Sequence, residues 1–320
     1  MRLTTLLFYA LVGLAAYGQT QAPTDGERPA EIDPTEQAYQ QLLELDDEAL
    51  TKIDEWIRAS QRPDATETES IAIMGKIKAQ IGPVREAYEA FIKDHPEHSK
   101  ARLTYASFLT DIGEETEALP HLIKATELDP HLPAAWNNLA NYYGHSGDLK
   151  KAFTHYEKAI SIKPDEAVYY HNFGTTVFLF RKDVKEHYNI TEEEVFDKAL
   201  LLYKKAQSYD PQNFDLAEDI AQTYYGIRTQ DVPSKMARPN EALKAWRYAE
   251  GIAPAEFEKQ GVYLHLARVY IDLADFAKAE EQLKKISLPV YQELRDRIAR
   301  RVPGYKPDAL PALPTPVDSL

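Results

Sequence analysis

The chain has 320 residues, with 37 Lys and Arg against 51 Asp and Glu, and a formal net charge of −14. This acidic balance disfavours a nucleic-acid partner, because binding a phosphate backbone needs clustered Lys and Arg. The absence of cysteine excludes a cysteine nucleophile, a disulfide framework and a lipid attached through cysteine.

The N-terminus predicts an export signal. Arg2 is followed by an apolar run from Leu3 to Tyr17 and a small-residue exit at Gly18. We interpret residues 1–18 as a secretory signal peptide. The apolar run is shorter than the ~20 residues that a bilayer span needs, although an uncleaved anchor is the alternative. We therefore expect an exported protein, periplasmic or extracellular, with no membrane span after cleavage.

A flexible linker and two pairs of helices are expected next. Residues 19–34 are rich in proline and polar residues, which is typical of a linker. Apolar residues at helical spacing predict an N-terminal helical pair within 35–61, as helices 35–45 and 47–59. A second pair, 67–81 and 84–93, follows the break at Pro63.

Residues 133–164 form the most regular segment. Its first helix places large apolar residues on one face. Its second helix places small residues and one aromatic residue on one face. These residues are Trp136, Leu139 and Tyr143, then Ala152, Tyr156 and Ala159. Gly147 and Asp148 predict the turn between the helices. Lys163 precedes Pro164 and is disfavoured in helical geometry, so the second helix should end there.

This pattern recurs along the chain. The prolines that close successive segments are Pro96, Pro130, Pro164, Pro211 and Pro254, and the first three are 34 residues apart. The segment resembles a tetratricopeptide repeat, a helix-turn-helix unit of 34 residues. The resemblance covers residues 99–286 and is degenerate over 66–98. Ala140 stands where the family usually has glycine.

The resemblance implies an all-α fold: a right-handed superhelix, or α-solenoid, of about five helix-turn-helix repeats with extra helices at both ends. The solenoid would span residues 66–302 and end in a capping helix from about 290. That helix should have Val290, Leu294 and Ile298 on its apolar face and Arg295 on its charged face. Residues 303–320 are rich in proline and predict an extended tail.

Two repeats carry extra residues between their helices. In the third, we expect the first helix to continue toward His187, and Thr191 with Glu194 predicts a capping box for the second. In the fourth, residues 226–239 predict an irregular loop. Stacking would place 182–193 and 226–239 on one edge as a lip. In the preceding repeat, a helix starting near Glu117 would keep Pro120 in its first turn.

No catalytic motif is present. The sequence has no Gly-x-Ser-x-Gly elbow, no His-Glu-x-x-His pair and no phosphate-binding loop. The nine histidines are scattered and are interpreted as packing or surface residues. We therefore predict no enzyme, no catalytic residues, no cofactor and no metal.

The resemblance implies a concave groove, lined by the first helices of the repeats, that holds an extended peptide or a helix of a partner. The candidate residues of this groove are Asn137, Asn138, Asn141, His171, Asn172, Asp215 and Asp219. Asn138 and Asn172 are one period apart and match the asparagine ladder in the repeats of O-linked N-acetylglucosamine transferase. Thr104 and Asp219 interrupt this ladder on either side. The alternative is that these asparagines are solvated polar residues.

Asp215 and Asp219 are acidic where co-chaperones of the family carry the Lys and Arg that grip a carboxylate, so that activity is not expected. The leading prediction is a monomeric exported scaffold or adaptor that binds a protein or peptide in the groove. One alternative is an assembly or regulatory subunit of a cell-envelope complex, bound through the lip. Another is an enzyme of unrecognised type that uses the acidic groove. The sequence does not specify the partner or the process.

Overall fold

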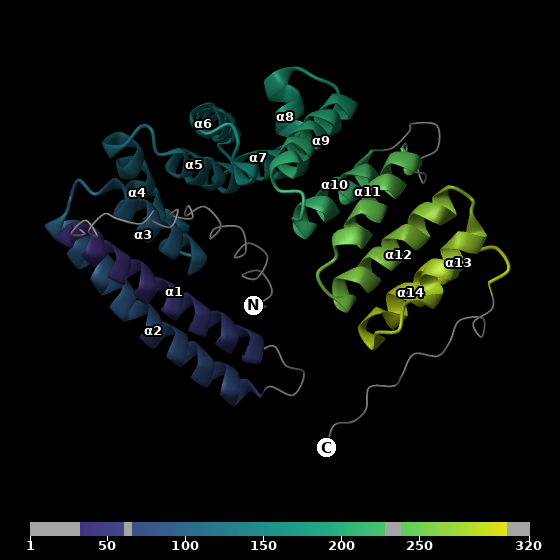
Figure 1. Cartoon of the computed structure of the whole chain (residues 1–320), viewed down its shortest axis with the longest axis horizontal. Coiled ribbons are helices and arrows are strands. Elements are labelled where there is room, and N and C mark those ends of the chain that lie inside the picture. The colour runs from purple at the N-terminus through teal and green to yellow at the C-terminus, as the bar shows by residue number, and fades with distance from the viewer. Residues whose placement is uncertain (1–32, 61–65, 228–237, 306–320) are drawn as a thin grey trace, which may run out of the picture. The chain divides into compact units, whose positions relative to one another are not determined.

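The structure, a computed structural model, describes residues 33–60, 66–227 and 238–305, and throughout these ranges it contains helices and no strand. The chain divides into two compact units, residues 1–164 and 165–320. Each unit is a series of helices in which sequence neighbours pack side by side (Figure 1). The prediction of an all-α fold is confirmed.

Unit 1 holds three consecutive helical hairpins. They are α1 (Pro34–Ser60) with α2 (Glu67–Asp94), α3 (Ser99–Asp111) with α4 (Glu115–Leu128), and α5 (Pro133–Ser146) with α6 (Leu149–Ile162).

Unit 2 continues the pattern with one added helix and a C-terminal cap. Its elements are α7 (Ala167–Leu179), α8 (Arg181–Tyr188), α9 (Glu192–Tyr209), α10 (Phe214–Gly226), α11 (Pro239–Ile252), α12 (Glu256–Asp272), α13 (Phe276–Lys284), the 3-10 turn η2 (Pro289–Tyr291) and α14 (Gln292–Ala299). The paired helices are α7 with α9, α10 with α11, and α12 with α13.

The α5–α6 hairpin forms as the sequence predicts. Gly147 ends α5 at φ 89°, a left-handed conformation that glycine adopts without a steric penalty. Asp148 caps α6 by accepting a hydrogen bond from the amide of Lys151. Ala152 and Ala159 are fully buried, which confirms that the small residues lie where helices touch.

The expected N-terminal helical pair is wrong, because α1 is one continuous helix from Pro34 to Ser60. No glycine or proline interrupts its interior, and Asp46 lies within it with its carboxylate accepting a hydrogen bond from the Tyr88 hydroxyl. The second expected pair is also one helix. In α2, Pro83 removes one backbone donor, but buried Val84 and Tyr88 hold the following turns in place.

The insert in the third repeat forms a separate helix, so the prediction that α7 continues toward His187 is wrong. The chain turns at Phe180, where the Arg181 guanidinium donates to the Phe178 carbonyl at 2.6 Å. This turn brings Val184 of α8 into full burial. The capping box of Thr191 and Glu194 at the start of α9 is confirmed. Of the second insert, residues 228–237 lie outside the described residues, as do 1–32 and 306–320.

The C-terminal cap buries other residues than the sequence predicts. Val290 lies in η2 and is 69% exposed, because the α-helix begins only at Gln292. Ile298 is buried as expected, but Arg295 is buried with it rather than facing solvent. In unit 1, α4 begins at Glu115, two residues earlier than expected, and Pro120 therefore lies beyond the first turn.

Candidate functional site

Four carboxyl groups of unit 2 form what we call the acidic face: Asp215, Glu218 and Asp219 of α10 and Glu258 of α12. The three on α10 share one side of the helix because they are spaced i, i+3 and i+4. Burial, and then the negative charges of Asp215, Asp219 and Glu258, raise the pKa of the Glu218 carboxyl to about 7. One carboxylate oxygen of Glu258, Oε2, is buried without a hydrogen-bond partner among the described residues. The acidic face therefore favours a positively charged group.

His171 and Asp219, both expected to line the groove, contact each other. The Nε2 atom of His171 donates to Oδ2 of Asp219 at 2.8 Å and links α7 to α10. His171 is only 8% exposed and packs edge-on against the Tyr203 ring. It is thus a positioning residue for Asp219, whereas Asp215 is exposed at the surface.

The three candidate asparagines of unit 1 are hydrogen-bonded within it. Asn137 is buried, contrary to its expected place on the groove surface, and its amide donates to Asn138 Oδ1 at 3.2 Å. The Asn138 amide donates to Ser107 Oγ at 3.1 Å, and Asn141 Oδ1 accepts from the Tyr156 hydroxyl at 2.7 Å. Asn138 and Asn141 remain half-buried and keep part of their surface for a partner.

Asn172 is half-buried on α7 of unit 2. Because Asn138 and Asn172 belong to different units, the ladder that they would form together stays a prediction.

Glu258 is the member of the acidic face that sequence reasoning missed. Asp215 follows the closing Pro211 by four residues, and Glu258 follows Pro254 by the same interval. Both acids lie in the first turn of their helices, and this shared place is the signal by which Glu258 could have been found.

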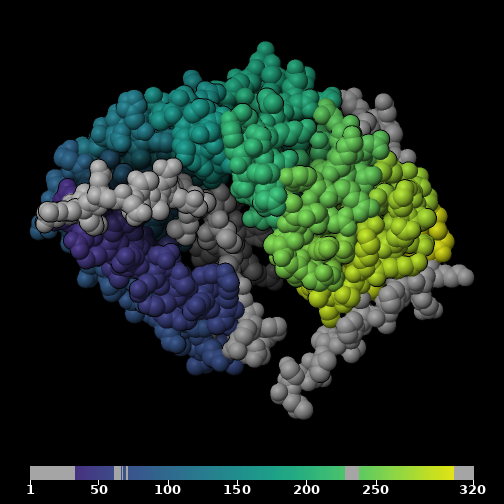
Figure 2. Space-filling model, viewed as in Figure 1, coloured from purple at the N-terminus to yellow at the C-terminus, as the bar shows by residue number. Residues whose placement is uncertain are grey.

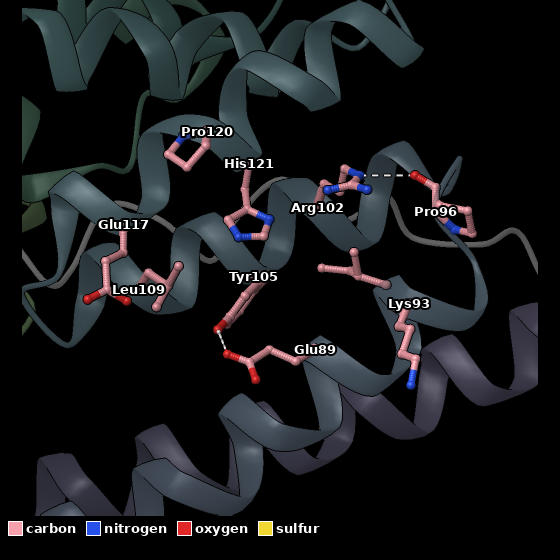
Figure 3. A pocket seen from close by; sticks show the side chains of 10 residues that line it. Glu89, Lys93, Pro96, Arg102, Tyr105, Leu109, Glu117, Pro120 and His121 are labelled. Carbon is pink, nitrogen blue, oxygen red and sulfur yellow. Dashed lines mark hydrogen bonds between the residues drawn. The ribbon is translucent and has the colours of Figure 1, made fainter.

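An open depression of about 570 Å³ lies in unit 1 between α2, α3 and α4 (Figure 3). It is lined by Glu89, Ile92, Lys93, Pro96, Arg102, Tyr105, Leu109, Glu117, Pro120 and His121. The Tyr105 hydroxyl donates to Glu89 at 3.1 Å, and Arg102 Nε donates to the Pro96 carbonyl at 3.0 Å. Burial and then the Arg102 charge lower the pKa of His121.

The described part of the chain contains no group of three or more His, Cys, Asp or Glu side chains placed to hold a metal ion. None of its helices is long and apolar enough to cross a membrane.

Comparison with known proteins gives matches to the repeats and to the fold. Family models described as tetratricopeptide repeat match residues 133–166 and 261–286. No curated protein matches the chain significantly.

Three of the similar solved structures are PilW, YrrB and MamA. PilW, described as a widely conserved type IV pilus biogenesis factor, has 13% identity, covers 72% of this chain and 95% of its own, and has a TM-score of 0.53. YrrB, described as a TPR protein with an unusual peptide-binding site, has 19% identity, coverages of 68% and 99%, and a TM-score of 0.50. MamA has 21% identity, coverages of 57% and 94%, and a TM-score of 0.42.

The repeat models match two segments whose helix pairs are present in the structure, α5 with α6 and α12 with α13. The 34-residue spacing of the closing prolines extends the same unit to the neighbouring hairpin of α3 and α4. The chain is a tetratricopeptide-repeat protein with an all-α repeat fold.

Proposed function

We propose that this protein is an exported, non-enzymatic scaffold or adaptor that binds a basic segment of a protein partner along the first helices of its repeats. The observation that carries the proposal is the acidic face of α10 and α12, where burial and neighbouring carboxylates raise the pKa of Glu218 to about 7. A carboxyl group in that state binds a proton near neutral pH and would exchange it for a lysine or arginine of a partner. The His171 hydrogen bond fixes Asp219 beside it before any partner arrives.

The asparagines supply the second part of the proposal. A carboxamide has both a donor and an acceptor, so it pairs with both polar groups of a peptide unit. Asn138 in unit 1 and Asn172 in unit 2 would each hold a stretch of extended backbone with little dependence on its sequence, while the acidic face selects basic side chains. Because Asn138 also donates to Ser107, its orientation is set before binding.

The test uses synthetic peptides of equal length, one alternating Lys and Ala and the other Glu and Ala. Calorimetry at pH 7.5 should show binding of the lysine peptide only. The double change Asp215→Asn with Glu218→Gln should abolish this preference. The double change Asn138→Ala with Asn172→Ala should weaken binding ~10-fold, since each lost hydrogen bond contributes ~0.5–1.5 kcal/mol. Equal affinity for both peptides would refute the proposal.

A second candidate is favoured by the contacts of Arg238. Its guanidinium donates to Asp197 at 2.6 Å and to Glu193 at 2.8 Å, so the end of one insert is tied to the end of the other. A lip built from residues 182–193 and 226–239, of which 228–237 lie outside the described residues, would suit an assembly or regulatory subunit of a cell-envelope complex. Crosslinking in the native host separates the candidates. Partners lost only with Arg238→Ala indicate the lip, and partners lost only with Glu218→Gln indicate the acidic face.

Export rests on the sequence of residues 1–18. The mature protein is expected to begin at Gln19, and N-terminal mass spectrometry of the protein recovered outside the cytoplasm measures this directly. A cytoplasmic protein that retains Leu3–Tyr17 would contradict it.

A further inference from the structure

The half of the α1–α2 hairpin farther from α3 has an apolar surface that no other described helix covers. Residues 71–83 of α2 include none that is buried, and Ile71 and Met74 are 64% and 57% exposed. The half of α2 that packs on α3 differs, because Tyr88 there is fully buried and stacks on Tyr105. Figure 1 shows the two long helices side by side, with the distal half extending past α3.

The distal half of α2 has apolar or small residues on most of its circumference, interrupted by Lys76 and Lys78. Ile73, Ile77 and Ile81 recur at helical spacing and are half-buried, as expected for the side toward α1. Ile71 and Met74 lie on other sides of the helix, together with a row of small residues, Ala72, Gly75, Ala79 and Gly82. A Cβ atom added at Gly75 or Gly82 would meet no atom within 4 Å. Large exposed apolar side chains beside a row of small residues mark this side of α2 as a surface for a protein contact.

Charge indicates which partner. Between residues 71 and 81 the only charged residues are Lys76 and Lys78, whereas the antiparallel stretch of α1 is acidic. The exposed acids on that stretch are Glu44, Asp47, Glu48, Asp54 and Glu55. An anionic membrane surface would be repelled by this neighbouring helix. A second hairpin of the same kind would instead place its acidic helix near these lysines, and its own Lys76 and Lys78 near these acids.

The sizes of the side chains on α2 also favour a second copy of this hairpin as the partner. When two copies of α2 are laid antiparallel, one register places Ile71 opposite Gly82 of the other copy and Met74 opposite Ala79. The large side chains then fill the gaps above the small ones, and twofold symmetry makes both halves of the contact identical. We propose that the distal α1–α2 hairpin is a homodimerisation surface, at which two copies of this chain form an antiparallel four-helix bundle. This inference is independent of the proposed function and differs from the monomer that the sequence suggests.

Sedimentation velocity of the mature chain between about 1 and 100 µM, a range that brackets a micromolar Kd, measures the mass directly. The wild type should be a dimer at the upper end, and Ile71→Glu with Met74→Glu should remain a monomer. Both residues are exposed, so circular dichroism should show an unchanged helix content. The matched control is Leu201→Glu, which changes a residue of unit 2 that is 70% exposed and should leave the dimer intact.

Crosslinking tests the register. Because the chain has no cysteine, Met74→Cys with Ala79→Cys introduces the only thiols, and oxidation should link two chains. Leu201→Cys should give no covalent dimer under the same conditions. A wild type that is monomeric up to about 100 µM, or a dimer that persists in the double glutamate variant, would overturn the proposal. Glu218→Gln should not alter the mass, so failure of this proposal is distinguishable from failure of the peptide-binding proposal.

Discussion

His171 and Asp219 are 48 residues apart in the chain, and a 2.8 Å hydrogen bond joins the imidazole of one to the carboxylate of the other. The bond connects α7 to α10, the first helices of two successive hairpins of unit 2. A link of this kind fixes the spacing of the repeats as well as the direction of the Asp219 side chain.

Removing either partner of this bond should destabilise unit 2. Asp219→Ala leaves a buried imidazole donor without its acceptor, which costs ~1–3 kcal/mol. Urea unfolding of Asp219→Ala, His171→Ala and the double variant forms a cycle in which we expect a coupling energy above ~0.5 kcal/mol. Asp215→Ala, at an exposed carboxylate on the same helix, is the control and should change stability little. Strict additivity in the cycle would show that the two side chains do not interact in solution.

The raised pKa of Glu218 predicts a pH dependence of stability. Its folded pKa, about 7, lies above the ordinary 4.5, so ionisation is less favourable in the folded state. Glu218 therefore costs no stability below pH 4.5, and its cost grows as the pH rises through 7. Glu218→Gln should leave urea unfolding at pH 4 nearly unchanged and make the protein more stable than wild type at pH 8. The exposed Glu281→Gln should show no such difference. Parallel curves for wild type and Glu218→Gln across this range would contradict the assignment.

Gly174 is required by close packing between α7 and α9. A Cβ atom at this position would lie 2.7 Å from Cδ1 of Tyr203, whose ring is buried and whose hydroxyl donates to Thr175. Gly174→Ala should therefore destabilise the protein by ~1–3 kcal/mol through overpacking. The control is Gly251→Ala in α11, where an added Cβ meets nothing within 4 Å. That change should stabilise the helix by up to ~1 kcal/mol, since alanine has the higher helix propensity. Thermal melts of both variants decide whether the two glycines have opposite roles.

Ala159 tests the packing of the central repeat. It is fully buried in α6, so Ala159→Leu should cost ~1–3 kcal/mol and lower the melting temperature. Ala90→Leu adds the same atoms to an exposed position of α2 and should be nearly neutral. If the two variants melt together, the buried face of α6 has been assigned wrongly.

Local sequence determined the repeat and the ends of its helices. Three local features appear in the structure: the turn at Gly147, the helix cap at Asp148 and the capping box of Thr191 and Glu194. Each depends on residues within four positions of each other. The buried alanines follow from helical periodicity, because a helix must place its small residues where a neighbour approaches closely.

Only the tertiary structure decided which polar residues are available to a partner. Asn137 and Asn138 are adjacent and chemically identical, yet the first is buried and the second half-buried, because the neighbouring helices α3, α4 and α6 pack on only part of the surface of α5. Asp46, in the middle of α1, accepts a hydrogen bond from a hydroxyl of α2, a contact that no local pattern indicates. Glu258 joins the acidic face from another helix in the same way. Periodicity fixes which side of a helix a residue occupies, but burial and pairing depend on the neighbouring helices, and only packing brings those neighbours together.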